Sequence, residues 1–233
     1  MINISMKRIV YICFCIAWSI SIVSAQTNTS EYDVQKLIRC YNMERDSGTL
    51  ATKRAYFNAF PATFVDFKDT FGYEDALSEE ANGSLYEESL DYITKFFHLY
   101  KNINPHELSN KIISICINGR WDADAVNYLQ TNVINIVTSS HLSKNNCYDS
   151  SEIFPCFNDT LRDALLSRLA LLSDDEVLSF WKFYLDRPET MPVDEMLYQQ
   201  TKTIIQEYPN LLCQLQNAYI HALLNIPNEN DIE

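Results

Sequence analysis

Glycine is scarce in this sequence, with only four residues in 233, at positions 48, 72, 83 and 119. Loops that cradle phosphate need glycines close together, because a Cβ atom would keep the backbone amides away from the phosphate. Neither G-x-G-x-x-G nor the P-loop pattern occurs, and G-x-S-x-G is also missing. The sequence therefore argues against nucleotide binding and carries no local signature of a catalytic serine.

Metal-ligand spacings are missing as well. No C-x-x-C or H-x-x-x-H pattern occurs, and the four histidines are scattered, at positions 98, 106, 141 and 221. Metal sites that can be read from a sequence usually combine such short spacings of cysteine and histidine. We therefore expect neither a metal nor a cofactor.

The sequence also lacks an apolar run long enough to span a membrane. The longest run, Ile9 to Val23, has about 15 residues, whereas a membrane-spanning helix needs roughly 18 to 20. Lys7 and Arg8 precede this run and Ala25 follows it, an order typical of a cleavable export signal. We expect residues 1–25 to be a signal peptide, which would leave a periplasmic or secreted chain with no transmembrane segment.

Basic residues are few: 18 Lys and Arg stand against 31 Asp and Glu, a formal net charge of −13. The predicted signal contains two of the basic residues and no acidic one, so its removal makes the chain more acidic. Nucleic acids and anionic lipids would repel such a chain. The charge suits either simple solubility or binding to a basic protein.

Of the seven cysteines, five lie outside the predicted signal, and an exported protein usually pairs some of its cysteines. Cys147 and Cys156 bracket the turn-rich loop "CYDSSEIFPC", whose closure by a disulfide would stabilise the fold by about 2 to 3 kcal/mol. Cys40 and Cys213, near the two ends of the chain, form a second candidate pair. Cys116, within apolar "IISICI", is interpreted as a buried free thiol.

From residue 30 onward, apolar residues recur every three or four positions, and no alternating strand pattern is found. This period is typical of amphipathic helices. We predict an all-α fold, a compact bundle of about ten helices in antiparallel pairs, with a short irregular α-solenoid as the second choice. The expected helices cover residues 31–44, 50–59, 62–71, 84–101, 105–118, 123–138, 159–171, 174–185, 193–207 and 210–225.

These helices are expected to form a single domain over residues 26–226, since about 200 residues can bury a core of their own. Residues 227–233 are interpreted as an acidic, flexible tail. Local signals mark several helix ends. Ser173 with Glu176, and Ser84 with Glu87, have the capping-box spacing, and Gly119 is expected to end a helix in the left-handed conformation.

The segment "FNAFPATFVDFKDTF", residues 57–71, places five phenylalanines three or four positions apart. Pro61 divides it into two short helices, and the spacing gathers the rings on one side. Burying five rings at about 1.5 to 3 kcal/mol each would stabilise the fold strongly. We therefore expect these phenylalanines to belong to the core rather than to an exposed groove for a partner.

The segment "NGRWDADAVNYLQ", residues 118–130, contains the only candidate functional residues, Trp121, Asp122 and Asp124. A tryptophan beside two carboxylates can hold a sugar or activate a water molecule. However, residues two apart do not share a face of a helix, and Asp122 is well placed to cap one. We prefer this capping interpretation and predict no catalytic residue.

Together, "FPATFVDF", "FGY", "LYEESLDYITKFF", "NGRWDADAVNYLQ" and "FWKFYLD" resemble a family of uncharacterised bacterial exported helical proteins. The resemblance covers about residues 57–185. It implies a helical exported protein, and it implies no activity or catalytic residue.

Export, acidity and a helical body favour a protein that binds another, basic protein and is not an enzyme. An immunity or inhibitor protein that neutralises a toxin or hydrolase would have these properties. One alternative is a cell-wall or glycan hydrolase that uses Trp121, Asp122 and Asp124. Another is a structural component of the envelope that associates through the phenylalanine-rich segment.

Overall fold

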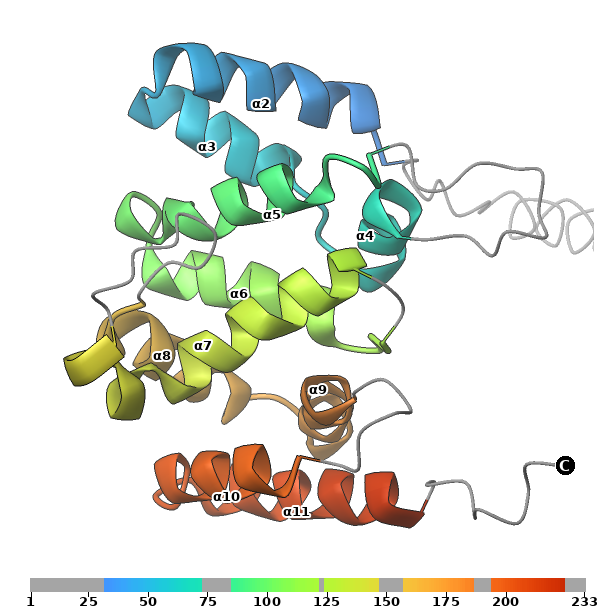
Figure 1. Cartoon of the computed structure of the whole chain (residues 1–233), viewed down its shortest axis with the longest axis vertical. Coiled ribbons are helices and arrows are strands. Elements are labelled where there is room, and N and C mark those ends of the chain that lie inside the picture. The colour runs from blue at the N-terminus through green and yellow to red at the C-terminus, as the bar shows by residue number, and fades with distance from the viewer. Residues whose placement is uncertain (1–31, 73–84, 122–123, 147–156, 187–193, 225–233) are drawn as a thin grey trace, which may run out of the picture. The chain divides into compact units, whose positions relative to one another are not determined.

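The protein is built from helices in every part that the computed structural model describes, namely residues 32–72, 85–121, 124–146, 157–186 and 194–224. Over these ranges the chain forms ten α-helices and one 3₁₀-helix, with no strand, which confirms the predicted all-α class (Figure 1). In chain order they are α2 (Val34–Ser47), α3 (Leu50–Ala59), α4 (Phe64–Phe71), α5 (Ser89–His98), η1 (Leu99–Lys101), α6 (Pro105–Cys116), α7 (Asp124–Asn146), α8 (Asp159–Leu169), α9 (Asp174–Leu185), α10 (Glu195–Ile204) and α11 (Pro209–Leu224).

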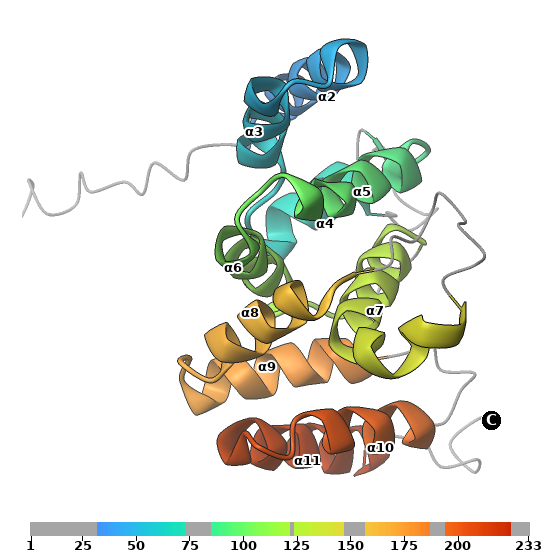
Figure 2. The same ribbon diagram turned by 90° about the vertical axis from the view of Figure 1, so that its left-hand side faces the viewer.

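The described helices belong to one unit, Asp33–Glu233, in which neighbours along the chain often lie side by side (Figures 1 and 2). Helix α2 packs on α3 and α10 packs on α11, while α6 contacts α8 and α9 contacts α11. Helix α7 connects earlier and later helices of the unit, because it contacts α5, α8 and α10. The predicted signal peptide and the predicted acidic tail lie outside the described residues.

The phenylalanine-rich segment forms part of the core, as predicted. All five rings are buried, with exposed fractions of 7% or less, and the segment is divided at Pro61 into α3 and α4. The Phe60 ring stacks on the Phe96 ring of α5, with 4.0 Å between centroids. Phe64 contacts Phe183 of α9 edge to face, at 6.0 Å. The segment therefore connects helices far apart in sequence, and its five rings do not form an exposed groove.

The start of α9 confirms its predicted capping box. The Ser173 side chain accepts from the backbone N–H of Glu176, and the Glu176 carboxylate accepts from the backbone N–H of Ser173 at 3.0 Å. The Ser173 hydroxyl also donates to Glu176 Oε2 at 2.6 Å, and this bond, followed by the one from the backbone N–H of Ser173, lowers the pKa of Glu176. Two backbone donors at this helix start are thus satisfied locally, which explains why the predicted and observed starts of the helix agree.

The predicted start of α5 is wrong. The helix begins at Ser89, and its N-cap residue Glu88 makes no side-chain capping bond. Leu85 is 7% exposed, and its backbone N–H donates to the carbonyl of Thr70 at the end of α4, at 3.0 Å. This tertiary contact holds residues 85–88 in turns, so the helix begins later than the local signal of Ser84 and Glu87 predicts. Ser84 itself lies outside the described residues.

The end of α6 also differs from the prediction. The helix ends at Cys116, and the left-handed residue is Asn118, with φ of 62°, instead of Gly119. Gly119 is needed for space, because a Cβ atom there would lie 2.6 Å from Cδ2 of Phe183 and 2.9 Å from the Cys116 carbonyl oxygen. Asparagine tolerates the left-handed region better than most residues, so the turn can use it.

The predicted disulfide between Cys40 and Cys213 is wrong, since both thiols are free. Cys40 lies on α2 at one end of the unit, whereas Cys213 lies on α11 at the other (Figures 1 and 2). Helices α2 and α11 therefore do not meet in the way that this candidate pairing requires. Cys116 is a buried free thiol, as predicted. Cys147 and Cys156 lie outside the described residues, so their disulfide stays a prediction.

Candidate functional site

The segment around Trp121 lies against the end of α9, and two of its three candidate residues are described. Trp121 is 36% exposed, and its backbone N–H donates to Oδ2 of Asp186 at 2.6 Å. Asp124 is exposed, and its Oδ2 accepts from the Tyr86 hydroxyl at 3.2 Å. Asp122 lies outside the described residues. Each described carboxylate therefore has a structural partner.

Asp186 is a member of this site that the sequence reasoning missed. It follows α9 directly, and Gln130 of α7 donates through Nε2 to the carbonyl of Phe183 at 2.6 Å and to that of Asp186. Gln130 is 2% exposed, so these bonds hold the end of α9 against α7. Residues 65 positions apart meet here, and no short spacing in the sequence could have shown it. The arrangement is well suited to joining α9, α7 and the segment that ends at Trp121.

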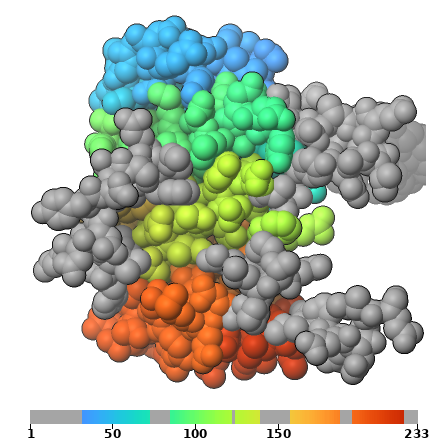
Figure 3. Space-filling view, in the orientation of Figure 1, coloured from blue at the N-terminus to red at the C-terminus, as the bar shows by residue number. Residues whose placement is uncertain are grey.

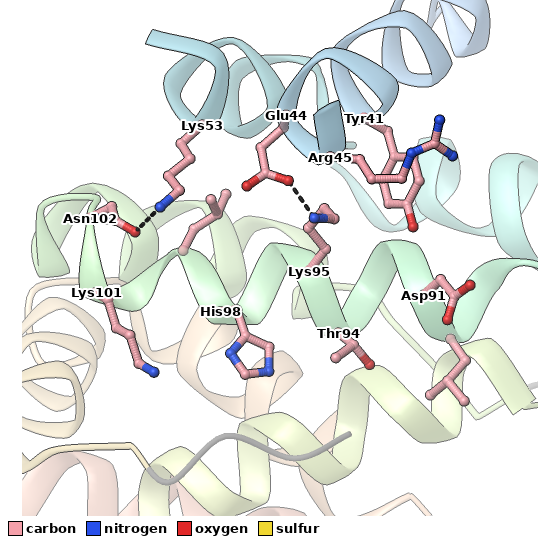
Figure 4. A pocket seen from close by; sticks show the side chains of 12 residues that line it. Tyr41, Glu44, Arg45, Lys53, Asp91, Thr94, Lys95, His98, Lys101 and Asn102 are labelled. Atoms are coloured by element: carbon pink, nitrogen blue, oxygen red, sulfur yellow. Dashed lines mark hydrogen bonds and ion pairs between the residues drawn. The ribbon is translucent and has the colours of Figure 1, made fainter. Parts of the chain in front are cut away.

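A separate groove of about 730 Å³ lies between α2–α3 on one side and α5–η1 on the other (Figure 4). This volume is in the range of sites for small organic ligands. We refer to it as the α2–α5 groove. It is lined by Tyr41, Glu44, Arg45, Lys53, Leu90, Asp91, Thr94, Lys95, His98, Leu99, Lys101 and Asn102.

The α2–α5 groove is lined by more basic than acidic residues, although the chain as a whole is acidic. Its lining includes four lysines and arginines but only two acidic residues, while acidic residues predominate in the whole sequence, 31 to 18. Lys95 forms an ion pair with Glu44, and both side chains are largely buried. Arg45 pairs with Asp46 at 3.2 Å. The positive side of the groove therefore depends on its two remaining lysines, Lys53 and Lys101.

Neither remaining lysine forms a salt bridge with a described residue. Lys53 Nζ donates to the neutral Asn102 Oδ1 at 3.0 Å, as the dashed line in Figure 4 shows. Lys101 Nζ lies 5.6 Å from the centroid of the Tyr100 ring. An ammonium group has three donors, so the bond to Asn102 leaves Lys53 with donors to spare. These charges are available to an anionic ligand.

The wall of the groove formed by α2 is held on α5 by aromatic contacts. The Tyr41 and Tyr92 rings stack with 3.9 Å between centroids, and Lys95 Nζ lies 5.5 Å from the Tyr41 ring centroid. Burial, followed by the nearby Asp91 carboxylate, raises the pKa of Tyr41. The groove is thus preformed by packing between two helices.

The surface of α10 and α11 carries a third feature, a group of exposed apolar side chains. Met196, Ile220, Leu223 and Leu224 have exposed fractions of 67%, 46%, 44% and 79%, and we refer to them as the terminal patch. Stacking of Tyr198 on Tyr219, at 4.0 Å, brings the start of α10 beside the second half of α11. In Figure 3, α10 and α11 (orange to red) are exposed at the lower end.

No candidate metal site is found among the described residues, where no three His, Cys, Asp or Glu side chains gather suitably. Within the same ranges, no helix has both the length and the apolar character needed to cross a bilayer.

Comparisons with models of protein families, with curated protein sequences and with solved structures found no match.

Proposed function

We propose that this chain is an exported protein that binds a basic protein partner and is not an enzyme, as expected for an immunity or inhibitor protein against a toxin or hydrolase. The observation that carries the proposal is the terminal patch on α10 and α11, an exposed apolar surface beside acidic side chains. Exposed apolar surface of this kind is typical of sites that bind other proteins.

The apolar side chains of α11 lie on one face of the helix. Ile220, Leu223 and Leu224 are three and four positions apart, which places them side by side on the helix surface. The opposite face of α11 is the one that packs on the protein, through residues that include Leu211 and Leu215, both fully buried. Helix α11 therefore has a second apolar surface that the described part of the fold leaves exposed.

The C-terminal helices that carry the terminal patch have more acidic than basic residues. Over residues 157–186 and 194–224, which include α8 to α11, nine acidic side chains stand against four basic ones. Glu195 directly precedes Met196 of the patch, and partial burial together with this carboxylate raises the pKa of Tyr219. Protein interfaces usually combine apolar and polar side chains, and the net negative charge of these helices favours a basic partner.

The proposal is tested by capture with the purified protein as bait, at low and high salt, from the envelope and culture fluid of its own cells. We expect one stoichiometric basic protein, released as the salt concentration rises. Ile220→Asp should lose this protein, because it places a charge in the apolar centre. Leu50→Asp is the matched control, since Leu50 is 64% exposed on α3 and far from the patch in sequence.

Titration calorimetry with the purified partner then decides the result. A Kd weakened at least about tenfold by Ile220→Asp and unchanged by Leu50→Asp would support the proposal. Equal binding by both variants, or binding that does not respond to salt, would refute it. Light scattering on the free protein separates partner binding from self-association, the behaviour expected of a structural envelope component.

The alternative function, glycan hydrolysis at Trp121, Asp122 and Asp124, has weaker support. The Asp124 carboxylate accepts a hydrogen bond from Tyr86, and the Trp121 backbone donates one to Asp186. Both residues therefore take part in contacts that stabilise the fold. Asp122→Asn would abolish turnover of a glycan if Asp122 were catalytic. If Asp122 caps α7, as its sequence predicts, Asp122→Ala lowers the free energy of unfolding by about 1 kcal/mol and changes no activity.

A further inference from the structure

We propose that the α2–α5 groove binds a small organic monoanion, a molecule with one carboxylate, sulfonate or phosphate-ester group on an apolar body. The observations are the groove itself, its excess of basic over acidic lining residues, and Lys53, which forms no salt bridge with a described residue. This inference is independent of the proposed function, because the groove and the terminal patch involve different helices.

The anionic group is placed at Lys53. This side chain extends from α3 toward Asn102, which ends η1, and the two lie together at one end of the groove (Figure 4). The ammonium group can donate to a ligand oxygen while it keeps its bond to Asn102. The side-chain amide nitrogen of Asn102 is a further donor, although an uncharged one. Lys101, the neighbouring residue, also lines the groove, but its side chain extends away from Lys53 (Figure 4).

The remaining charges of the groove select against a second anionic group. Glu44 occupies the middle, where its carboxylate is held by Lys95, and Asp91 lies at the end opposite Lys53 (Figure 4). A polyanion would bring its second charge close to these carboxylates, and such like-charge contacts are costly. A ligand with a single anionic end avoids them.

The apolar part of the ligand has surfaces to contact. Tyr41 and Leu90 line the groove and are half-buried, so each presents some carbon surface to a ligand. Tyr41 is fixed by its stacking on Tyr92, and the ion pair between Glu44 and Lys95 joins α2 to α5. Because these contacts exist without a ligand, binding requires little ordering of the site.

The probe is 8-anilinonaphthalene-1-sulfonate, an aromatic monoanion whose fluorescence rises in apolar surroundings, titrated into the purified protein. Lys53→Gln is expected to weaken its affinity about tenfold, the effect of losing one charge-assisted hydrogen bond. Lys53→Arg, which keeps the charge, should retain most of the affinity. Lys202→Gln is the control, since Lys202 is exposed on α10 and lies over the Tyr198 ring. It removes the same charge outside the groove.

Two further arms make the outcome decisive. Ile220→Asp tests whether the probe binds the terminal patch, and the proposal expects unchanged affinity for this variant. Competition compares benzoate with pyrophosphate at equal ionic strength, and benzoate should displace the probe more effectively. Equal affinities of Lys53→Gln and Lys202→Gln, stronger competition by pyrophosphate, or loss of binding in Ile220→Asp would each overturn the proposal. Circular dichroism confirms that every variant compared is folded.

Discussion

The side-chain amine of Lys111 on α6 donates a hydrogen bond of 2.7 Å to the backbone carbonyl of Phe60, just beyond the end of α3. The same amine donates to the Phe57 carbonyl at 2.5 Å and lies 4.8 Å from the centroid of the Phe57 ring. The last carbonyls of a helix have no partner within it, so Lys111 satisfies groups that α3 leaves open. Burial, with a smaller contribution from Lys36, lowers the pKa of Lys111 to about 8.

This lowered pKa predicts that the stability contributed by Lys111 rises with pH. In the unfolded chain the lysine keeps its ordinary pKa of 10.5, so between pH 8 and 10.5 the unfolded state binds more protons than the folded state. The free energy of unfolding therefore increases through this window and is independent of Lys111 titration below it. Urea unfolding from pH 7 to pH 10 should show that the free energy of unfolding of the wild type, measured relative to that of Lys111→Met, increases with pH. A difference that stays constant with pH would contradict the prediction.

The phenylalanine-rich segment predicts a sharp contrast between two neighbouring positions. Phe67 is 0% exposed, while Val65 is 66% exposed on the same helix. Phe67→Ala should lower the free energy of unfolding by about 3 to 5 kcal/mol, because it leaves a cavity in the aromatic core. Val65→Ala should change it by less than about 0.5 kcal/mol. Similar losses from the two substitutions in urea unfolding would show that α4 is not packed as described.

Gly119 predicts a coupling with Phe183. In Gly119→Ala the new Cβ would lie 2.6 Å from Cδ2 of Phe183, so we expect a loss of about 1 to 3 kcal/mol in the free energy of unfolding. Phe183→Leu should make the alanine less harmful, and a double-mutant cycle measures this coupling. The comparison is Gly48→Ala, which is strained by φ of 60° but meets no atom closer than 3.9 Å. Its effect should add to that of Phe183→Leu, and additivity in both cycles would rule out the contact at Gly119.

The cysteines predict an order of reaction with a thiol reagent. Cys213 is exposed and should react first, Cys40 is half-buried and should react more slowly, and Cys116 is buried. Burial also raises the pKa of Cys116, which lowers its reactivity further, so it should react only on unfolding. Cys213→Ser should remove the fast phase alone.

Mass spectrometry of unreduced peptides tests the predicted disulfide between Cys147 and Cys156, and free thiols at both positions would refute it.

Local signals in the sequence were sufficient for most helices. The boundaries of α3 and α9 agree with the prediction, because Pro61 and the capping box at Ser173 act within a few residues of the helix ends. The start of α5 was mistaken because a contact between Leu85 and Thr70 competes with the local signal. Helix α7 extends to Asn146, beyond the predicted end at residue 138.

The candidate sites were less accessible to sequence reasoning. The segment at Trp121 was recognised by its residue types, but Asp186, which binds its backbone, is 65 positions away. The α2–α5 groove was not predicted at all. Its lysines lie in two separate segments, Lys53 on α3 and Lys95 and Lys101 on α5 and η1, and each of them alone is an ordinary residue of a helix surface.

The sequence by itself determined the helical class, the position of most helices and the burial of the phenylalanine-rich segment, because periodicity, caps and prolines act over a few residues. Tertiary structure alone decided which helix ends meet. It separated Cys40 from Cys213, brought Lys111 to the end of α3 and placed Lys53 beside Asn102. These contacts depend on how whole helix faces pack, which is a property of many side chains at once and of no single stretch of sequence.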